Sequence, residues 1–274
     1  TKLTEQNLNS NIGSVINWFA NSENMLVKMI SNNRKPLIDT NKIVPDGPTI
    51  STNFGEKAQN RTYQDLLKNK FDEHNFEQLS TSAIYKVSID GAVKKWMDDG
   101  MYRTISFSPN GEYVMISQIN KPFSYLVTYS RFPTETNVYS KDGNFISNLL
   151  NVPLIEELPK GFMSVRTGKR SFSWRPDKGA SLTYVTALDS GDPSKKVDFR
   201  DEVYELNYPF LGKGKFMLKT INRFSGIDWG TKDMAIAYDT WWNTRNRKSY
   251  VFNPSNPNIK PKIISDRNLS LIHI

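Results

Sequence analysis

The sequence predicts an all-β fold, a partial β-propeller of about four four-stranded blades with one inserted amphipathic helix. Short runs rich in Val, Ile, Thr, Tyr, Phe and Trp alternate with Gly, Pro, Asn and Asp, which is typical of strands joined by turns. A unit of four such runs recurs along the 274 residues with loops of unequal length, and this indicates propeller blades. A meandering β-sandwich has similar strands and turns and is the alternative.

Paired strands define the repeat. The clearest pairs are at 104–118, 171–189 and 224–242, and a weaker copy is at 14–30. After each pair comes a third strand that carries a tyrosine, and these tyrosines are Tyr85, Tyr139, Tyr204 and Tyr250. We therefore expect a propeller portion over residues 1–268, with blades at roughly 14–98, 100–155, 163–220 and 222–266.

The first blade contains an insertion over residues 31–80, which begins with a Pro-rich extended segment. In its second half Thr62 and Asp65 have the spacing of a helix-capping box. Apolar residues then recur at roughly helical intervals, at Leu66, Leu67, Phe71, Phe76 and Leu79. We expect one amphipathic helix that packs on the outside or rim of the propeller and serves as a lid or docking surface.

Residues 239–252, DTWWNTRNRKSYVF, place two tryptophans beside several cations. Aromatic rings next to cations are typical of single-stranded nucleic-acid binding. In the register of the repeat, however, this stretch is a strand, a hairpin turn and the next strand of the last blade, so Trp241 and Trp242 should point to opposite sides. The net charge of +8 is spread along the chain, and we expect no nucleic-acid partner.

Composition excludes several kinds of site. The chain has no cysteine, which excludes disulfides and thiolate chemistry, and its two histidines, His74 and His273, are too few for a zinc site. We expect no metal and no cofactor. No run of 18 apolar residues predicts a membrane span, and no signal peptide is visible at the polar start.

The sequence contains no convincing catalytic site. The nucleophile motif Gly-x-Ser-x-Gly is missing, and the nearest segment, GASLT at Gly179, lacks the second glycine. Acidic pairs occur at Asp98/Asp99, Glu156/Glu157 and Asp201/Glu202. Adjacent residues of a strand point to opposite faces, so these pairs do not form a catalytic dyad. We therefore expect no catalytic residue in this chain.

Several long segments between about residues 14 and 268 resemble the glutamyl endopeptidase branch of the prolyl oligopeptidase family of serine peptidases. These segments are NRTYQDLLKNKFDEHNFEQL, KPFSYLVTYSRFP, VPLIEELPKGFMSVRTGKRSFSWRPDK, LDSGDP, FRDEVYEL and YDTWWNTRN. The resemblance implies a propeller followed by an α/β-hydrolase domain with a Ser-Asp-His triad. By this resemblance we expect the chain to contain most of the propeller and none of the hydrolase domain. The final LSLIHI, residues 269–274, departs from the family pattern and is expected to be a non-native tail.

The resemblance implies a non-catalytic propeller that gates peptide substrates of a serine peptidase, with cleavage after or near glutamate. The chain alone should then be inactive. Arg131, Arg166 and Arg170 are the candidate substrate contacts, because guanidinium groups pair with carboxylates. For each of them, an ion pair within the propeller or exposure to solvent is the alternative. A free-standing propeller that binds a protein or peptide partner is the alternative function.

The location is predicted from the same resemblance. Bacterial relatives of this kind are usually exported, so we expect a periplasmic or secreted protein in a bacterium. The absence of cysteine fits both this location and the cytoplasm.

Overall fold

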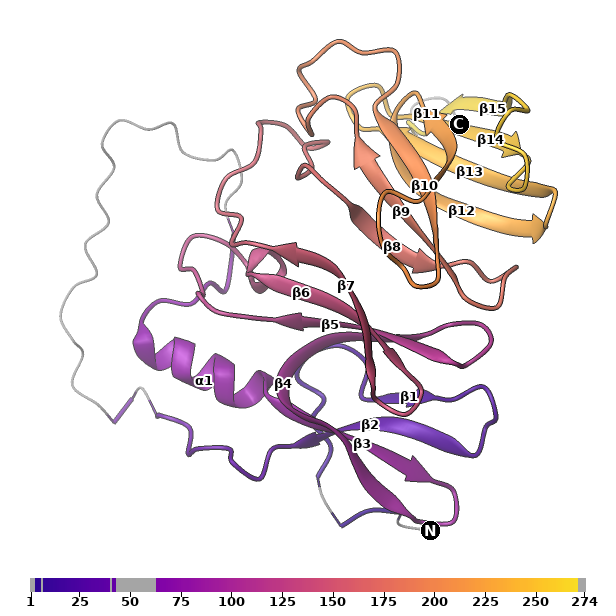
Figure 1. Cartoon of the computed structure of the whole chain (residues 1–274). Coiled ribbons are helices and arrows are strands. Elements are labelled where there is room, and N and C mark those ends of the chain that lie inside the picture. Colours follow the sequence, from indigo (N-terminus) through magenta and orange to yellow (C-terminus); the bar gives the residue numbers. More distant parts are fainter. Residues whose placement is uncertain (1–2, 6, 40, 43–62, 271–274) are drawn as a thin grey trace. The chain divides into compact units, whose positions relative to one another are not determined.

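The computed structural model describes residues 3–5, 7–39, 41–42 and 63–270. The chain forms two compact units, each of which is described by itself. Unit 1 comprises Thr1–Phe107 and Gly111–Glu156, and unit 2 comprises Ser108–Asn110 and Glu157–Ile274. Figure 1 labels their helices and strands.

Unit 1 contains one antiparallel sheet in which seven strands follow one another in chain order. The strands are β1 (Ile16–Trp18), β2 (Asn24–Ile30), β3 (Ser82–Ser88), β4 (Val93–Phe107), β5 (Tyr113–Ile119), β6 (Thr134–Ser140) and β7 (Phe145–Val152). The long β4 belongs to two four-stranded halves, since its first part pairs with β3 and its second part with β5. Gly100 lies where the halves meet, and a Cβ there would be 2.7 Å from the Tyr102 ring.

Unit 2 contains two four-stranded antiparallel sheets. The first consists of β8 (Arg170–Trp174), β9 (Ser181–Ala187), β10 (Asp201–Asn207) and β11 (Lys215–Thr220), and the second of β12 (Arg223–Thr231), β13 (Met234–Trp241), β14 (Asn246–Phe252) and β15 (Lys262–Asn268). One apolar core joins them. It consists of Val185, Val203, Met217 and Leu218 from the first sheet and Ala235, Ala237, Tyr250 and Phe252 from the second.

These sheets confirm the predicted fold class. Four consecutive four-stranded antiparallel groups, two of which share β4, have the strand order of propeller blades. The third strand of each group carries the predicted tyrosine, namely Tyr85 in β3, Tyr139 in β6, Tyr204 in β10 and Tyr250 in β14. The chain is therefore an all-β protein with a partial propeller pattern and one inserted helix.

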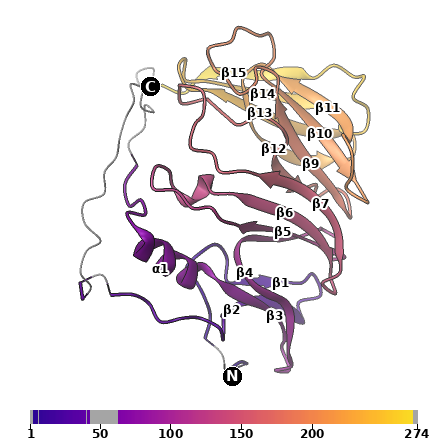
Figure 2. The ribbon, with the colours of Figure 1, turned by 60° about the vertical axis from the view of Figure 1, so that its left-hand side comes forward.

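The inserted helix α1 (Lys70–Ser80) begins later than the sequence suggested. Thr62 lies outside the described residues, and Asp65 lies in a bend with φ +55°. Asn69 caps the helix instead, because its side-chain oxygen accepts from the backbone N–H groups of the next turn. The helix lies against β4 in unit 1 (Figure 2), and its Phe76 packs edge-on against Phe123 at a centroid distance of 5.1 Å.

A buried lysine holds the segment before β1. Lys28 of β2 is only 2% exposed, and its Nζ donates to the carbonyl oxygens of Ile12 and Tyr102. Burial lowers the pKa of Lys28 to about 8. Next to this contact the chain turns through Gly13, with φ +62°, where a Cβ would lie 2.1 Å from the Arg103 carbonyl oxygen.

No helix in the described ranges is both long and apolar enough to cross a membrane.

Candidate functional site

One end of the two sheets of unit 2 gathers charged residues from distant parts of the chain. The strands β8, β10, β12 and β14 begin at this end, because neighbouring strands are antiparallel. Arg170 begins β8, Asp201 begins β10 and Arg223 begins β12, while Asp189 and Arg200 lie in the connection from β9 to β10. We call these five residues the arginine–aspartate network.

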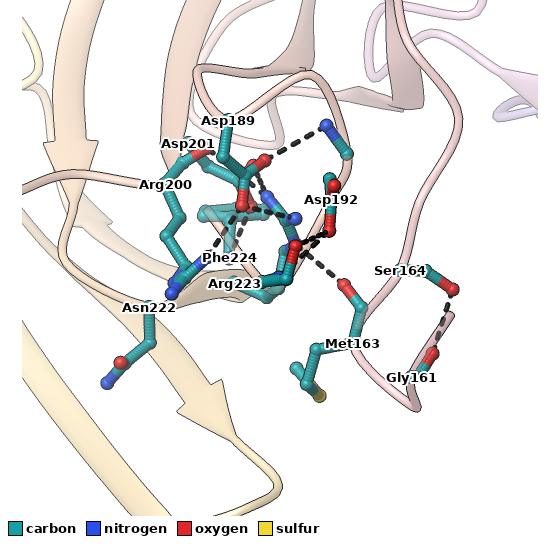
Figure 3. Close-up of polar contacts among 12 residues, drawn as sticks. Gly161, Met163, Ser164, Asp189, Asp192, Arg200, Asp201, Asn222, Arg223 and Phe224 are labelled. Atoms are coloured by element: carbon teal, nitrogen blue, oxygen red, sulfur yellow. Dashed lines mark hydrogen bonds and ion pairs between the residues drawn. The ribbon is translucent and has the colours of Figure 1, made fainter. Parts of the chain in front are cut away.

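The guanidinium group of Arg223 lies at the centre of this network (Figure 3). Its Nη2 donates to Asp189 Oδ2 at 2.6 Å, and its Nη1 donates to Asp201 Oδ1 at 3.2 Å. Arg200 Nη1 donates to Asp189 Oδ2 at 2.7 Å, and Arg170 forms an ion pair with Asp201. Asp189 and Asp201 are 1% and 0% exposed, so three guanidinium groups neutralise two carboxylates that water does not reach.

Backbone N–H groups complete the coordination of both carboxylates. Gly191 N donates to Asp189 Oδ1 at 3.0 Å, and Phe224 N donates to Asp201 Oδ2 at 2.8 Å. Each of the four carboxylate oxygens therefore has a charged or backbone partner, as burial of a charge requires. The network fixes the relative positions of these strand ends.

The network also anchors the loop of residues 157–169 that precedes β8. Arg223 Nε donates to the Met163 carbonyl oxygen at 2.9 Å (Figure 3), and Val165 N donates to the Gly191 carbonyl oxygen at 3.1 Å. Gly191 has φ +76°, and a Cβ there would lie 1.8 Å from the Val165 carbonyl oxygen, so this close approach requires glycine. The loop is held in place by contacts with buried groups.

Of the three predicted substrate contacts, Arg170 belongs to the network. It is 9% exposed and paired with Asp201. The structure thus shows for Arg170 the ion pair within the propeller that the sequence analysis gave as the alternative to a substrate contact.

Arg166 has a different environment in the anchored loop. Its guanidinium group is partly buried and donates to the carbonyl oxygens of Thr167, at 3.0 Å, and of Lys169. Among the described residues no carboxylate forms an ion pair with it. Burial and the nearby charge of Arg170 lower the pKa of Arg166. An incoming carboxylate would offset both effects, because it would neutralise a positive charge that the protein leaves unbalanced.

Arg131 belongs to unit 1, where it ends the short 3₁₀ helix η1 (Tyr129–Arg131). Its guanidinium carbon lies 5.4 Å from the centre of the Tyr63 ring. The neighbouring residues line a mainly apolar pocket with a volume of about 220 Å³. The lining residues are Gln64, Asp65, Leu66, Leu67, Phe76, Val127, Thr128, Tyr129 and Phe132. The structure therefore places Arg131 in a different unit from the other two candidates.

The tryptophan pair lies at the same end of unit 2 as the network. Trp241 ends β13 and is partly buried beneath Arg200, whose guanidinium carbon is 3.8 Å from the ring centre. Trp242 is 45% exposed and has Arg245 over its ring at 3.8 Å. The predicted hairpin is present, with its turn at residues 242–245, so Trp242 lies in the turn beyond the end of β13. Of the two rings, that of Trp242 is the more exposed.

Sequence reasoning missed Asp189, Arg200 and Arg223, and it treated Asp201 only as one of two adjacent acids. A signal was available, because charged residues begin three strands of unit 2, namely Arg170 in β8, Asp201 in β10 and Arg223 in β12. Their pairing, however, depends on which strand ends meet. In the described part of the chain, no group of three or more metal-ligating side chains is present.

The sheets and this site together define the class, which is a propeller-type β-protein with anchored, positively charged loops at one end of its unit 2 sheets. The chain is 39% identical over 228 residues to a probable chloroplastic glutamyl endopeptidase of Oryza sativa subsp. japonica, covering 82% of this chain and 24% of that protein. It is 34% identical over 259 residues to the protein of the same description from Arabidopsis thaliana, covering 92% and 26%. The predicted resemblance to glutamyl endopeptidases is confirmed by these two relatives. It spans about a quarter of the length of these curated relatives.

No family model matches the chain. The solved structures that match it share little sequence with it. An uncharacterized protein from Listeria monocytogenes has a TM-score of 0.48 and 7% identity, over 96% of this chain and 57% of that one. The β-propeller domain of the trilobed protease from Pyrococcus furiosus has a TM-score of 0.44 and 11% identity, over 93% and 57%. Because these TM-scores are below 0.5, the assignment of the fold rests on the strand order of the sheets alone.

The predicted bacterial periplasmic or secreted location is contradicted, because both plant relatives are described as chloroplastic. That prediction came from the usual behaviour of bacterial relatives, and no segment of this chain supported it.

Proposed function

We propose that this chain is the non-catalytic propeller of a serine peptidase, and that its loops admit peptides and exclude folded proteins. The peptidase part is supported by the similarity to proteins named glutamyl endopeptidase. By the same similarity, the peptides are cut after or near glutamate. On this proposal the chain alone is inactive and needs the peptidase domain to cleave its substrates.

The observation that carries the acidic preference is the environment of Arg166. Its loop is anchored to the arginine–aspartate network, so the guanidinium group is already held in place before a substrate arrives. It is partly buried beside Arg170 and has carbonyl partners but no carboxylate among the described residues. A preorganised, uncompensated cation favours an acidic side chain. Arg166 is therefore the substrate contact we propose in this unit.

A binding measurement tests this contact. Fluorescein-labelled peptides that differ only in one Glu or Gln are titrated with the full chain, and the dissociation constants are compared. We expect the Glu peptide to bind roughly tenfold more tightly, since a charge-assisted hydrogen bond contributes about 1.5–3 kcal/mol. Arg166→Gln should abolish the difference, while Arg267→Gln, at an exposed position of β15, should leave it unchanged. Equal affinities for the two peptides would refute the proposed contact.

The gating role is tested with this chain joined to a peptidase domain. One glutamate-containing segment is offered as a free peptide and within a tightly folded protein. We expect cleavage of the peptide only, and deletion of the propeller should make the folded protein a substrate. Cleavage of the folded protein by the intact form at a similar rate would contradict gating.

We propose a peptide rather than a nucleic acid as the ligand. Two cations of the DTWWNTRNRKSYVF stretch already have partners within the fold, since Arg247 lies 4.5 Å from the Tyr238 ring centre and Lys248 pairs with Asp266. A labelled single-stranded oligonucleotide should therefore bind weakly at physiological salt. Tight binding that falls by orders of magnitude with added salt would favour nucleic acid instead.

A further inference from the structure

Two large aromatic rings lie exposed on unit 2. Phe162 is 62% exposed and Trp242 is 45% exposed, and their ring centroids are 5.5 Å apart. They come from segments 80 positions apart in the chain. Apolar surface that gathers from distant segments and stays accessible to water marks interaction sites.

Both rings are carried by backbone that the fold holds in place. Phe162 directly precedes Met163, whose carbonyl oxygen accepts from buried Arg223 at 2.9 Å. The turn that carries Trp242 is closed by a bond from Arg245 N to the Trp242 carbonyl oxygen at 3.1 Å, and Leu269 N donates to the Arg245 carbonyl oxygen at 2.7 Å. A surface that is ordered before binding loses little entropy when a ligand arrives.

Positive charge accompanies this aromatic surface. The Arg245 side chain is exposed and lies 3.8 Å over the Trp242 ring, and no ion pair to a carboxylate is recorded for it within the described residues. Arg166 lies on the same loop as Phe162. The surface therefore complements a ligand that carries both an apolar group and a negative charge.

We infer that Phe162, Trp242 and Arg245 form a second peptide subsite, which binds an apolar side chain adjacent to an acidic residue of the substrate. The inference rests on the proposed function and narrows its substrate class to acidic peptides with a neighbouring Leu, Phe or similar residue. The two rings pack on the apolar side chain, and the Arg245 guanidinium group donates to a peptide carboxylate.

The test uses two fluorescein-labelled peptides that are identical except for Leu or Ser next to the glutamate. We expect the full chain to bind the Leu peptide about tenfold more tightly, because the subsite buries the additional methyl and methylene groups. Phe162→Ala and Trp242→Ala should each remove most of this preference, and both variants should fold, since neither side chain belongs to the buried core. Phe145→Ala, which removes a ring that is 59% exposed on β7, is the matched control and should keep the preference.

The outcomes separate this inference from the function on which it rests. A Leu preference that survives both ring substitutions overturns the subsite, even if Arg166→Gln still weakens both peptides. If the ring substitutions remove the Leu preference while Arg166→Gln has no effect on binding, the subsite is supported and the Arg166 contact is refuted. Absence of binding to either peptide overturns the inference, and so does competition by a single-stranded oligonucleotide that is lost in Trp242→Ala.

Discussion

Asp189→Asn tests whether the arginine–aspartate network holds unit 2 together. The wild-type network contains three guanidinium groups and two carboxylates, an excess of one positive charge. The substitution preserves shape but leaves three guanidinium groups with one carboxylate, an excess of two. Arg200 and Arg223, which converge on one Asp189 oxygen at 2.7 and 2.6 Å, lose its negative charge, and the single amide oxygen cannot accept both from them and from Gly191 N.

The magnitude follows from burial. Asp189 is 1% exposed and Arg223 is 3% exposed, so water cannot replace the lost carboxylate. Removing one partner of a buried ion pair destabilises a protein by about 3–5 kcal/mol. Whole-domain stabilities are about 5–15 kcal/mol, so this change removes about a fifth or more of the total free energy of unfolding.

Urea denaturation followed by tryptophan fluorescence is the suitable assay. Four of the six tryptophans, Trp174, Trp229, Trp241 and Trp242, lie in unit 2, so the signal mainly reports its unfolding. We expect the midpoint to fall by roughly 1–2 M, from the loss above and a typical slope of about 2–3 kcal/mol/M.

Asp266→Asn is the matched control for the same chemical change. Asp266 also pairs with a cation, Lys248, but its side chain is 50% exposed. Exposed pairs contribute about 0–1 kcal/mol, so the control should unfold close to the wild type. If Asp189→Asn were no more destabilised than Asp266→Asn, the buried network would not stabilise unit 2 and our account of its anchoring role would fail.

Further predictions concern single groups. Burial lowers the pKa of Lys28 from the ordinary 10.5 to about 8 in the folded chain. Between these two pH values the unfolded chain therefore binds more protons than the folded chain. The free energy of unfolding should rise with pH across this window, by up to about 3 kcal/mol. Lys28→Met should flatten this rise in urea titrations at pH 7 and 10, and an unchanged slope would contradict it. Gly13→Ala should destabilise unit 1 by more than about 2 kcal/mol, because the added Cβ clashes with backbone. Gly91 is also at positive φ but has nothing within 4 Å of a Cβ, so in thermal melts Gly91→Ala should lower the free energy of unfolding by only about 1 kcal/mol. Tyr250→Phe removes a hydroxyl bonded at 2.5 Å to a buried aspartate and should destabilise unit 2 by about 1.5–3 kcal/mol. A loss no larger than that of Tyr238→Phe, which removes a solvent-exposed hydrogen bond to Asp228, would refute this.

The strands could be predicted because their signals are local. Apolar runs of five to eight residues between Gly, Asn, Asp and Pro turns form strands wherever they can pair, and the repeating tyrosine marked the third strand of each group. The start of α1 was missed, although its signal was also local. The capping-box spacing pointed to Thr62 and Asp65, whereas the helix begins at Lys70 with Asn69 as its cap, and its Phe76 packs against Phe123 and Phe132.

The candidate site was less accessible to sequence reasoning. Arg166 and Arg170 are four positions apart and have the same charge, yet one has an aspartate partner and the other has carbonyl partners only. Nothing in their immediate sequence distinguishes them, because the difference comes from Asp201, which lies 31 positions further along the chain.

The sequence by itself thus determined the all-β class, the four strand groups and the relationship to glutamyl endopeptidases, since each depends on short patterns that recur along the chain. Only the tertiary structure decided which charges are buried together and which remain available at the surface. Asp189 and Arg223 are 34 positions apart and meet because β9 ends and β12 begins at the same end of unit 2. Which charged residues form ion pairs here depends on which strand ends meet in space, and the spacing of the residues along the chain does not show this.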